Sequence, residues 1–325
     1  MTNSLIILFD PDTYVWLAIA VLSLLTVAVL SWWHRSHRRR PCLLCAAVLL
    51  AAWYVVLYGT FVEVTQLTVR HEEYASSDLP DAFDGYRIVQ FSDAHLGSYN
   101  GWRQPILSRA IDSINAQKAD LIVFTGDLQN KVPDEITPHM PQLKRLKAKD
   151  GICSVMGNHD YPSYTDLNDM QKMTNLGQTM SAEQDMGWQL LNNTWRRIRR
   201  GDDCIYIAGM ENDGEGRHPQ LGDIASALTT LNRQAFVVML EHDPTSWRRK
   251  ILPHSHCQLT LSGHTHGGQF SLFGLTPASL TYREHSGMYY AGNRALNVST
   301  GLSGVIPIRF GTTPEIVVIT LKKKK

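Results

Sequence analysis

Two long apolar segments near the N-terminus dominate the pattern of hydrophobic and polar positions. Residues 14–33 and 42–61 each run for twenty positions without a charged side chain. About 20 apolar residues cross the hydrocarbon core of a bilayer as an α-helix, and the aromatic residues at the segment ends are favoured at the membrane–water interface. The pattern predicts two transmembrane helices, at about residues 14–33 and 42–61. A helical hairpin buried in a soluble core is the alternative.

The charges around these segments predict their orientation. The loop between them, HRSHRRRP, contains four arginines, Arg38 among them, whereas the first thirteen residues contain Asp10 and Asp12 and no basic side chain. Basic loops stay in the cytoplasm, so we expect both termini on the outer side. The N-terminus also lacks the basic region of a cleavable signal peptide. Residues 1–65 are therefore expected to remain as a multi-pass anchor in an inner or plasma membrane, with residues 66–325 in the periplasm or outside the cell.

From about residue 86 onward, short apolar runs alternate with amphipathic stretches. Such runs are typical of buried β-strands, and they occur at residues 86–93, 120–127, 151–160, 204–213, 235–243 and 257–268. Residues 104–117 place apolar side chains at helical spacing, and residues 140–146 do so more weakly. Strands that alternate with helices predict an α/β layered domain.

Two further stretches give weaker patterns. Residues 62–69 alternate imperfectly, which predicts a first strand there, followed by a polar link through residues 71–77 to Pro80. Residues 161–195 are polar and lack strong periodicity. We expect them to form an irregular segment near the active-site rim that takes part in substrate selection.

Composition and charge exclude several classes of protein. A chain with 44% hydrophobic and 19% charged residues is neither disordered nor collagen-like. Lys and Arg number 31 against 30 Asp and Glu, so we expect no nucleic-acid partner. Five cysteines are too sparse for a disulfide framework in a chain of this size. An anionic ligand must therefore be held by local chemistry.

Most of the apolar runs end in side chains that can bind metals. These side chains are Asp93, His95, Asp127, Asn158, His159, His242, His264 and His266. Because loops that leave one edge of a sheet lie near each other, we expect these side chains to converge. Carboxylate, imidazole and amide groups without a thiolate favour Mn, Fe or Zn, and one carboxylate shared between two cations would make a two-metal site. The histidines at positions 71, 139, 218, 254, 256 and 285 are expected to be structural or solvated.

The same side chains fall into ordered sequence blocks. DAH, GD, GNHD, the histidine of LEHD, and GHTH follow one another along the chain. This order resembles the DxH, GD, GNH[DE], His and GHxH blocks of the calcineurin-like metallophosphoesterase superfamily, over about residues 81–321. GHTHGGQF and PIRFGTTPEI are similar to the bacterial membrane-anchored branch of that superfamily. The resemblance implies an α/β (α+β) fold, a four-layer αββα sandwich in which two β-sheets face each other between helices.

The resemblance also implies a role for each side chain. The implied ligands are Asp93, His95 and His266 for one ion, Asn158, His242 and His264 for a second, and Asp127 as the bridge between them. His159 would act as a general acid or as a donor to the transition state. The implied cofactors are two divalent or trivalent ions, Mn, Fe or Zn, and the implied reaction is attack of a metal-bridging hydroxide on phosphorus.

One departure from the family pattern narrows the expected function. Residues 126–132 read GDLQNKV, whereas the protein phosphatases of this superfamily have GDxxDRG, so Asn130 replaces an aspartate and removes a carboxylate partner for His159. We expect a membrane-anchored, dinuclear-metal-dependent phosphoesterase that hydrolyses a phosphodiester or pyrophosphate of a lipid or nucleotide. A phosphomonoesterase and a non-catalytic membrane scaffold are the alternatives.

Overall fold

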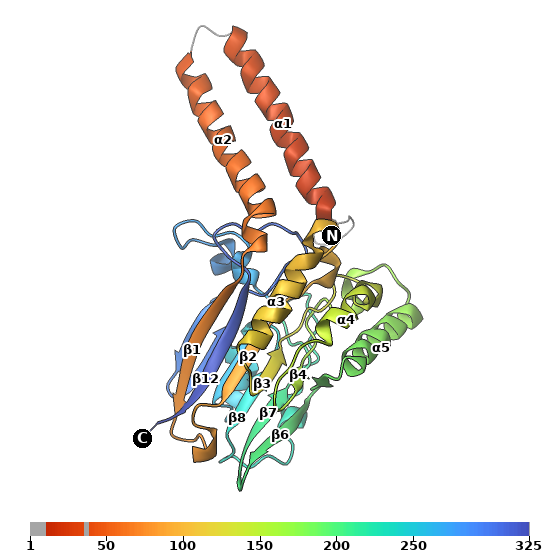
Figure 1. The fold of residues 1–325 in the computed structure, drawn as a ribbon, viewed down its shortest axis with the longest axis vertical. Helices are drawn as coiled ribbons and strands as arrows, with labels where there is room; N and C mark the ends of the chain where they lie inside the picture. Colours follow the sequence, from red (N-terminus) through yellow and green to blue (C-terminus); the bar gives the residue numbers. More distant parts are fainter. Residues whose placement is uncertain (1–10, 36–38, 325) are drawn as a thin grey trace.

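The N-terminal part of the computed structural model is a helical hairpin. The structure describes residues 11–35 and 39–324; Asp10 and Arg38, which enter the predicted orientation, lie outside them. Helices α1 (Pro11–Arg35) and α2 (Arg39–Phe61) cover both predicted spans and stand side by side at one end of the molecule (Figure 1). Only 11% of each apolar window is buried. The helices are long and apolar enough to cross a membrane, and they do not form the core of the folded domain.

Two six-stranded mixed sheets form the rest of the fold. The first contains, in spatial order, β1 (Thr68–Ser76), β12 (Glu315–Lys323), β2 (Arg87–Phe91), β3 (Leu121–Phe124), β4 (Ile152–Ser154) and β5 (Gln189–Leu190). The second contains β10 (Gly287–Ala291), β11 (Arg294–Val298), β9 (Leu259–Ser262), β8 (Val237–Leu240), β7 (Asp203–Gly209) and β6 (Thr194–Arg200). Each of the six apolar runs contributes one strand, as predicted.

Three hydrophobic clusters show how the layers stack. The first lies between the sheets and includes Val123 of β3 and Leu240 of β8. Ile122 and Phe124 point the other way, because side chains alternate along a strand, and they pack with α3 (Gln104–Ala116) and α4 (Met140–Leu143). On the outer face of the second sheet, a third cluster contains Trp247 together with residues of α6 (Ile224–Ala227) and α7 (Leu252–His254). The predicted four-layer sandwich is confirmed.

Helix α3 matches its predicted segment. Its buried face carries Leu107, Ile111 and Ile114 at helical spacing. Helix α4 is a single turn and therefore shorter than the predicted segment 140–146. Both helices cover the outer face of the first sheet, beside the strands that carry candidate ligands.

The first strand lies further along the chain than predicted. Residues 63–65 form a 3₁₀ turn, and β1 occupies the segment expected to be a polar link. β1 is an edge strand, which among the described strands pairs with β12 alone. Its polar side chains therefore stay near the surface, where Arg70 donates to Glu72 and Glu315. The prediction was wrong because an edge strand accepts polar residues that a central strand excludes.

Residues 161–195 are also more regular than predicted. They include α5 (Asp169–Asp185), β5 and the start of β6. Asn168 and Gln171 form a capping box at the start of α5. Thr179 and Glu183 are the buried residues of α5, and both are polar. The prediction of an irregular segment was wrong because this helix lacks the apolar stripe by which a helix is recognised in sequence.

The carboxyl ends of the central strands face the hairpin. β2, β3 and β4 are parallel, and β2 runs antiparallel to β12, which is parallel to β1. The carboxyl ends of β2, β3 and β4 therefore lie at the edge where β1 begins, just after α2. In Figure 1 the C-terminus lies at the opposite end of the domain from the hairpin. Loops that follow β2, β3 and β4 are thus on the hairpin side.

Candidate metal centre

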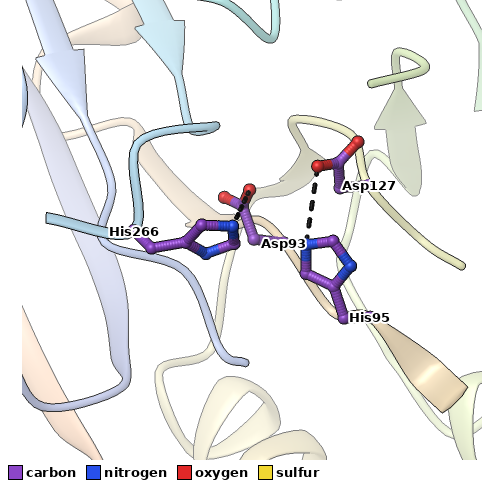
Figure 2. A group of neighbouring side chains, drawn as sticks. All are labelled: Asp93, His95, Asp127 and His266. Atoms are coloured by element: carbon purple, nitrogen blue, oxygen red, sulfur yellow. Dashed lines mark ion pairs between the residues drawn. The ribbon is translucent and has the colours of Figure 1, made fainter. Parts of the chain in front are cut away.

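The structure brings all eight predicted side chains together at one edge of the two sheets. Each follows the carboxyl end of a strand: Asp93 and His95 after β2, Asp127 after β3, Asn158 and His159 after β4, His242 after β8, and His264 and His266 after β9. Figure 2 shows four of them with their side chains gathered around one point. The arrangement follows from strand direction, since parallel strands deliver their loops to the same edge.

The first group of candidate ligands consists of Asp93, His95, Asp127 and His266. Each offers a ligand atom that lies within 4.8 Å of the others. His95 Nε2 is 3.5 Å from Asp127 Oδ2, and His266 Nε2 is 3.8 Å from Asp93 Oδ1 (Figure 2). Two carboxylates and two imidazoles form a ligand set that suits Mn, Fe or Zn.

The second group shares Asp127 with the first. Asp127, His242 and His264 also offer ligand atoms within 4.8 Å of one another. His242 Nε2 lies 3.2 Å from both Asp127 Oδ2 and Asn158 Oδ1, and His264 Nδ1 lies 2.7 Å from Asn158 Oδ1. Asp127 Oδ2 therefore faces His95 on one side and His242 on the other, a position from which a carboxylate can bridge two ions.

Burial and charge set the protonation of these groups. Burial alone would raise the pKa of Asp127, but its histidine neighbours, His242 foremost, hold it well below its usual range. The Asp127 carboxylate in turn raises the pKa of His242 against the effect of burial. Burial lowers the pKa of His95 to about 3 and that of His264 to about 4. His95 and His264 are therefore neutral at pH 7, the form in which an imidazole binds a metal.

The hydrogen bonds of the histidines fit metal binding. His242 Nδ1 lies 2.6 Å from the Thr125 carbonyl; because a carbonyl only accepts, Nδ1 carries a proton, and Nε2 is the ring nitrogen that could exchange its proton for a metal ion. Both ring nitrogens of His95 and Nδ1 of His266 are buried without a hydrogen-bond partner among the described residues. An unsatisfied buried polar atom costs about 1–3 kcal/mol. This donor set of imidazole nitrogens and carboxylates therefore fits divalent cations.

The backbone is strained at several of these positions. Five of the seven candidate ligands have positive φ: Asp93 (51°), His95 (44°), Asp127 (62°), His264 (72°) and His266 (52°). This conformation costs about 1–3 kcal/mol for a residue other than glycine and clusters at functional sites. Gly157 packs so close that a Cβ there would lie 2.2 Å from Asp127 Oδ1. The backbone conformation of these loops therefore brings the candidate ligands together at a cost to the stability of the loops.

His159 lies beside the cluster and outside both ligand groups. Its ring is 4.9 Å from that of His95 and stacks on Tyr164 at 4.5 Å. Its backbone N–H donates to Asp127 Oδ1 at 2.8 Å. Its Nδ1 donates to the Asn130 carbonyl at 2.7 Å, which leaves Nε2 for proton transfer. The main-chain oxygen of Asn130 thus orients the His159 ring, as an aspartate side chain at position 130 could have done.

Asp160 holds the ligand loops in place. Its carboxylate accepts from the backbone N–H groups of Asp127, Leu128 and Gly157, each at 2.8 Å. These bonds join the loop after β3 to the loop after β4. Loss of this carboxylate would free the backbone that positions Asp127, the candidate ligand that both groups share.

Three further side chains at the second group were missed by the sequence patterns. The Asn158 amide donates to Tyr164 Oη at 2.8 Å, and Tyr164 Oη lies 3.0 Å from His218 Nδ1. Tyr282 Oη is 2.9 Å from His264 Nε2. His218 was expected to be structural or solvated, yet its ring lies 4.9 Å from that of His264. These residues come from loops outside the metal-binding blocks, so no motif spacing could reveal them.

Comparison with known proteins gives the family. The sequence model of the calcineurin-like phosphoesterase family matches residues 86–268. A Bacillus subtilis protein named uncharacterized metallophosphoesterase YkuE is 35% identical over 275 residues, which are 82% of this chain and 89% of that protein. A Danio rerio protein named transmembrane protein with metallophosphoesterase domain is 29% identical over 83% of this chain and 60% of its own length.

Solved structures resemble the chain more distantly. A phosphopantetheinyl hydrolase from Mycobacterium tuberculosis aligns with a TM-score of 0.43 and 13% identity, over 66% of this chain and 89% of that one. A dimetal phosphatase from Danio rerio aligns with a TM-score of 0.41 and 12% identity, over 67% and 88% of the two chains. By the family match and the bacterial relative, the chain belongs to the calcineurin-like phosphoesterase family and is a metal-dependent phosphoric ester hydrolase.

Proposed function

We propose that the chain is a membrane-anchored phosphodiesterase that works with two metal ions, with residues 1–65 as the anchor and residues 66–325 as the catalytic domain. The observation that supports this most is Asp127, whose Oδ2 lies 3.5 Å from His95 Nε2 and 3.2 Å from His242 Nε2. The ions are Mn, Fe or Zn. One ion would be held by Asp93, His95 and His266, the other by Asn158, His242 and His264, and Asp127 would contribute to both. When bound, two such ions supply an activated water nucleophile and neutralise the charge of phosphoryl oxygens.

His159 supplies the proton that the leaving group needs. The Asn130 carbonyl fixes Nδ1, and stacking on Tyr164 fixes the plane of the ring. Nε2 can therefore deliver a proton to the departing alkoxide, whose developing negative charge is otherwise costly. Asp127 also accepts from the backbone of His159, so the proton donor and the bridging carboxylate keep a fixed separation.

The charges around the site favour a phosphodiester over a phosphomonoester. A monoester dianion carries an additional charge and gains most from a free cationic side chain near the ions. Arg309 interacts with the Asp93 charge, but it is buried and donates to the carbonyls of Thr300, Ser303 and Thr312. Its guanidinium is therefore occupied within the protein and does not provide that cation.

The hairpin gives the enzyme its location. Two long apolar helices and a Danio rerio relative named as a transmembrane protein support a membrane anchor. The arginines of the 34–41 loop favour its retention in the cytoplasm, which places the catalytic domain on the periplasmic or extracellular side. A lipid phosphodiester or pyrophosphate in the bilayer is then the substrate class that this anchor brings within reach.

Paired hydrolysis assays test this proposal. The rates at which full-length protein with Mn²⁺ hydrolyses bis-p-nitrophenyl phosphate and p-nitrophenyl phosphate are compared. Asp127→Asn is the blank. Asp202→Asn is the matched control, because Asp202 lies in an exposed turn. We expect the diester to be cleaved at least about tenfold faster, an activity lost in Asp127→Asn and kept in Asp202→Asn. Faster cleavage of the monoester, or turnover that Asp127→Asn leaves intact, would overturn the proposal.

A further inference from the structure

The loop after the last metal-binding block carries an exposed apolar surface. Between β9 and β10, the exposed fractions are 96% for Phe273, 76% for Leu275 and 89% for Leu280, and Phe270 and Leu272 are also exposed. Residues 267–282 contain no charged side chain and no histidine. We call residues 270–280 the apolar loop. Single exposed apolar residues are ordinary, but a group of them on one uncharged loop marks an interaction surface.

The tip of the apolar loop is a tight turn. Leu272 and Leu275 exchange backbone hydrogen bonds, each at 3.0 Å, and enclose Phe273 and Gly274, both with positive φ. Two-residue turns of this kind favour Asn and Gly at these positions, and a bulky residue with positive φ is an unfavourable exception. Phe273 thus opposes local folding and makes little contact with the protein, which indicates that its side chain serves an external contact.

An aromatic series joins this loop to the hairpin. Phe270 stacks on Phe310 with ring centroids 5.5 Å apart. Phe310 contacts Tyr54 and Tyr58 of α2, at 6.1 Å in each case. Both tyrosines lie within the predicted span; by the helical rise, Tyr58 is about 5 Å and Tyr54 about 10 Å from its end. In Figure 1 the loops of the C-terminal region, drawn in blue, lie at the foot of α2.

A second aromatic contact joins the domain to the end of α2, near the start of α3. Trp102, just before α3, is 47% exposed and has its ring 5.7 Å from that of Phe61 at the end of α2. Tryptophan is favoured where the bilayer meets water. The membrane interface that α2 enters is therefore bordered by aromatic side chains of the domain at two places.

The apolar loop is also coupled to the metal centre. It begins four positions after His266. Between them, Gln269 donates from Nε2 to the carbonyls of Ile306 and Ile308 at 2.8 and 3.0 Å. Arg309, next along that segment, donates from its backbone N–H to the Gly59 carbonyl of α2 at 3.2 Å. One short connected structure therefore links a candidate metal ligand, the apolar loop and the membrane helix.

We propose that the apolar loop inserts its tip into the outer lipid interface beside α2 and holds the sheet edge that carries the metal centre near the phosphate layer of the bilayer. The proposal rests on the membrane-anchored function proposed above. It deepens that function by naming the part of the domain that brings the site to phosphodiesters of bilayer-resident lipids. The partner of the loop is the apolar part of the lipid interface, because the loop has no charged side chain with which to bind headgroups and Phe310 connects it to Tyr54 and Tyr58 of α2.

Depth measurement in vesicles tests the insertion. The parent for labelling is the full chain with Cys45 and Cys204 replaced by alanine. Phe273→Cys in this parent is spin-labelled and reconstituted in phosphatidylglycerol–phosphatidylethanolamine vesicles. The signal of the parent without Phe273→Cys, treated in the same way, is subtracted. Ala82→Cys is the control, since Ala82 is exposed beside the start of β7 at the edge away from the hairpin. We expect label 273 to be relaxed mainly by oxygen, as lipid-buried sites are, and label 82 mainly by a water-soluble nickel complex. Equal water exposure of the two labels would overturn the proposal.

A substrate comparison separates this inference from the proposed activity. Phe273→Ser/Leu280→Ser is compared with the unsubstituted chain on soluble bis-p-nitrophenyl phosphate and on a diacylglycerol p-nitrophenyl phosphodiester in vesicles. We expect an unchanged rate on the soluble diester and a loss of at least about tenfold on the vesicle substrate, because losing the apolar burial of either side chain alone would weaken the membrane contact by about that factor. Equal rates of variant and unsubstituted chain on the vesicle substrate would overturn the inference alone, whereas absence of soluble-diester hydrolysis in the unsubstituted chain would overturn the proposed function.

Discussion

Asp127 is the residue on which both halves of the site depend. It faces His95 and His242 through one oxygen, while its second oxygen accepts from the backbone of His159. Its backbone is held by Asp160, and Gly157 leaves the space that its carboxylate occupies. A single side chain therefore fixes the relation between the two groups of candidate ligands and His159.

His159→Gln should separate proton transfer from metal binding. We expect the variant to keep its metal content, because the His159 ring lies outside both ligand groups. Its rate should fall by about 10²–10⁴-fold for a diester with an alkyl leaving group, which needs a proton, and far less for a p-nitrophenyl ester, which does not. The checks are metal analysis and the ratio of the two rates, with the exposed His254→Gln as the control. Equal losses on both esters would contradict the role of general acid.

At this scale the sequence predicts residue types better than their surroundings. The candidate metal-binding side chains, from Asp93 to His266, could be found in the sequence because carboxylates and imidazoles stand at the ends of successive apolar runs. Their positive φ values could not, since they depend on contacts between loops far apart in sequence, such as the bond from the His264 N–H to Asp93. The same holds for His218 and Tyr164, which reach the site only through the fold.

At the scale of elements, α5 carries a buried carboxyl group against the first sheet. Glu183 is fully buried and accepts a hydrogen bond from Ser154 of β4. Burial raises its pKa from 4.5 to about 8. Its contribution to stability is therefore fully present below pH 4.5 and is lost as the pH rises through 8, because the folded state must then ionise a buried carboxyl.

Glu183→Gln should remove this pH dependence. Between about pH 5 and 8 this group lowers the free energy of unfolding of the unsubstituted protein by about 1.4 kcal/mol for each unit by which the pH rises. We expect Tm to fall less from pH 5.5 to 7.5 in the variant than in the unsubstituted chain. The exposed Glu73→Gln serves as the control. Identical pH dependence of Tm in Glu183→Gln and the unsubstituted chain would contradict the assignment.

The elements that sequence patterns predict are those with two apolar faces or one clear stripe. β2, β3, β4, β7, β8, β9 and α3 meet this condition. β1 does not, because it is an edge strand with polar side chains, and α5 does not, because its buried residues are Thr179 and Glu183. Both were predicted incorrectly for the same physical reason. Their side chains are mostly polar, and their burial depends on contacts with neighbouring elements, so the hydrophobic pattern of the sequence does not reveal these elements.

At the scale of the whole molecule, the hairpin and the metal centre lie at the same end of the fold. The antiparallel pairing of β2 with β12 turns the carboxyl ends of the central strands toward α2. Neither the two apolar segments nor the metal-binding blocks predict this, because it follows from strand order in the first sheet. The arrangement brings a candidate phosphoester site to the base of two helices that are long enough to cross a membrane.

Metal content measured together with hydrolysis tests the central claim most directly. We predict that active full-length protein holds about two ions per chain, and that Asp127→Asn loses both metal occupancy and hydrolysis of bis-p-nitrophenyl phosphate, whereas Asp202→Asn keeps both. A fully active protein with a single ion per chain would contradict the two-metal site. So would an Asp127→Asn variant that retains two ions and the full rate.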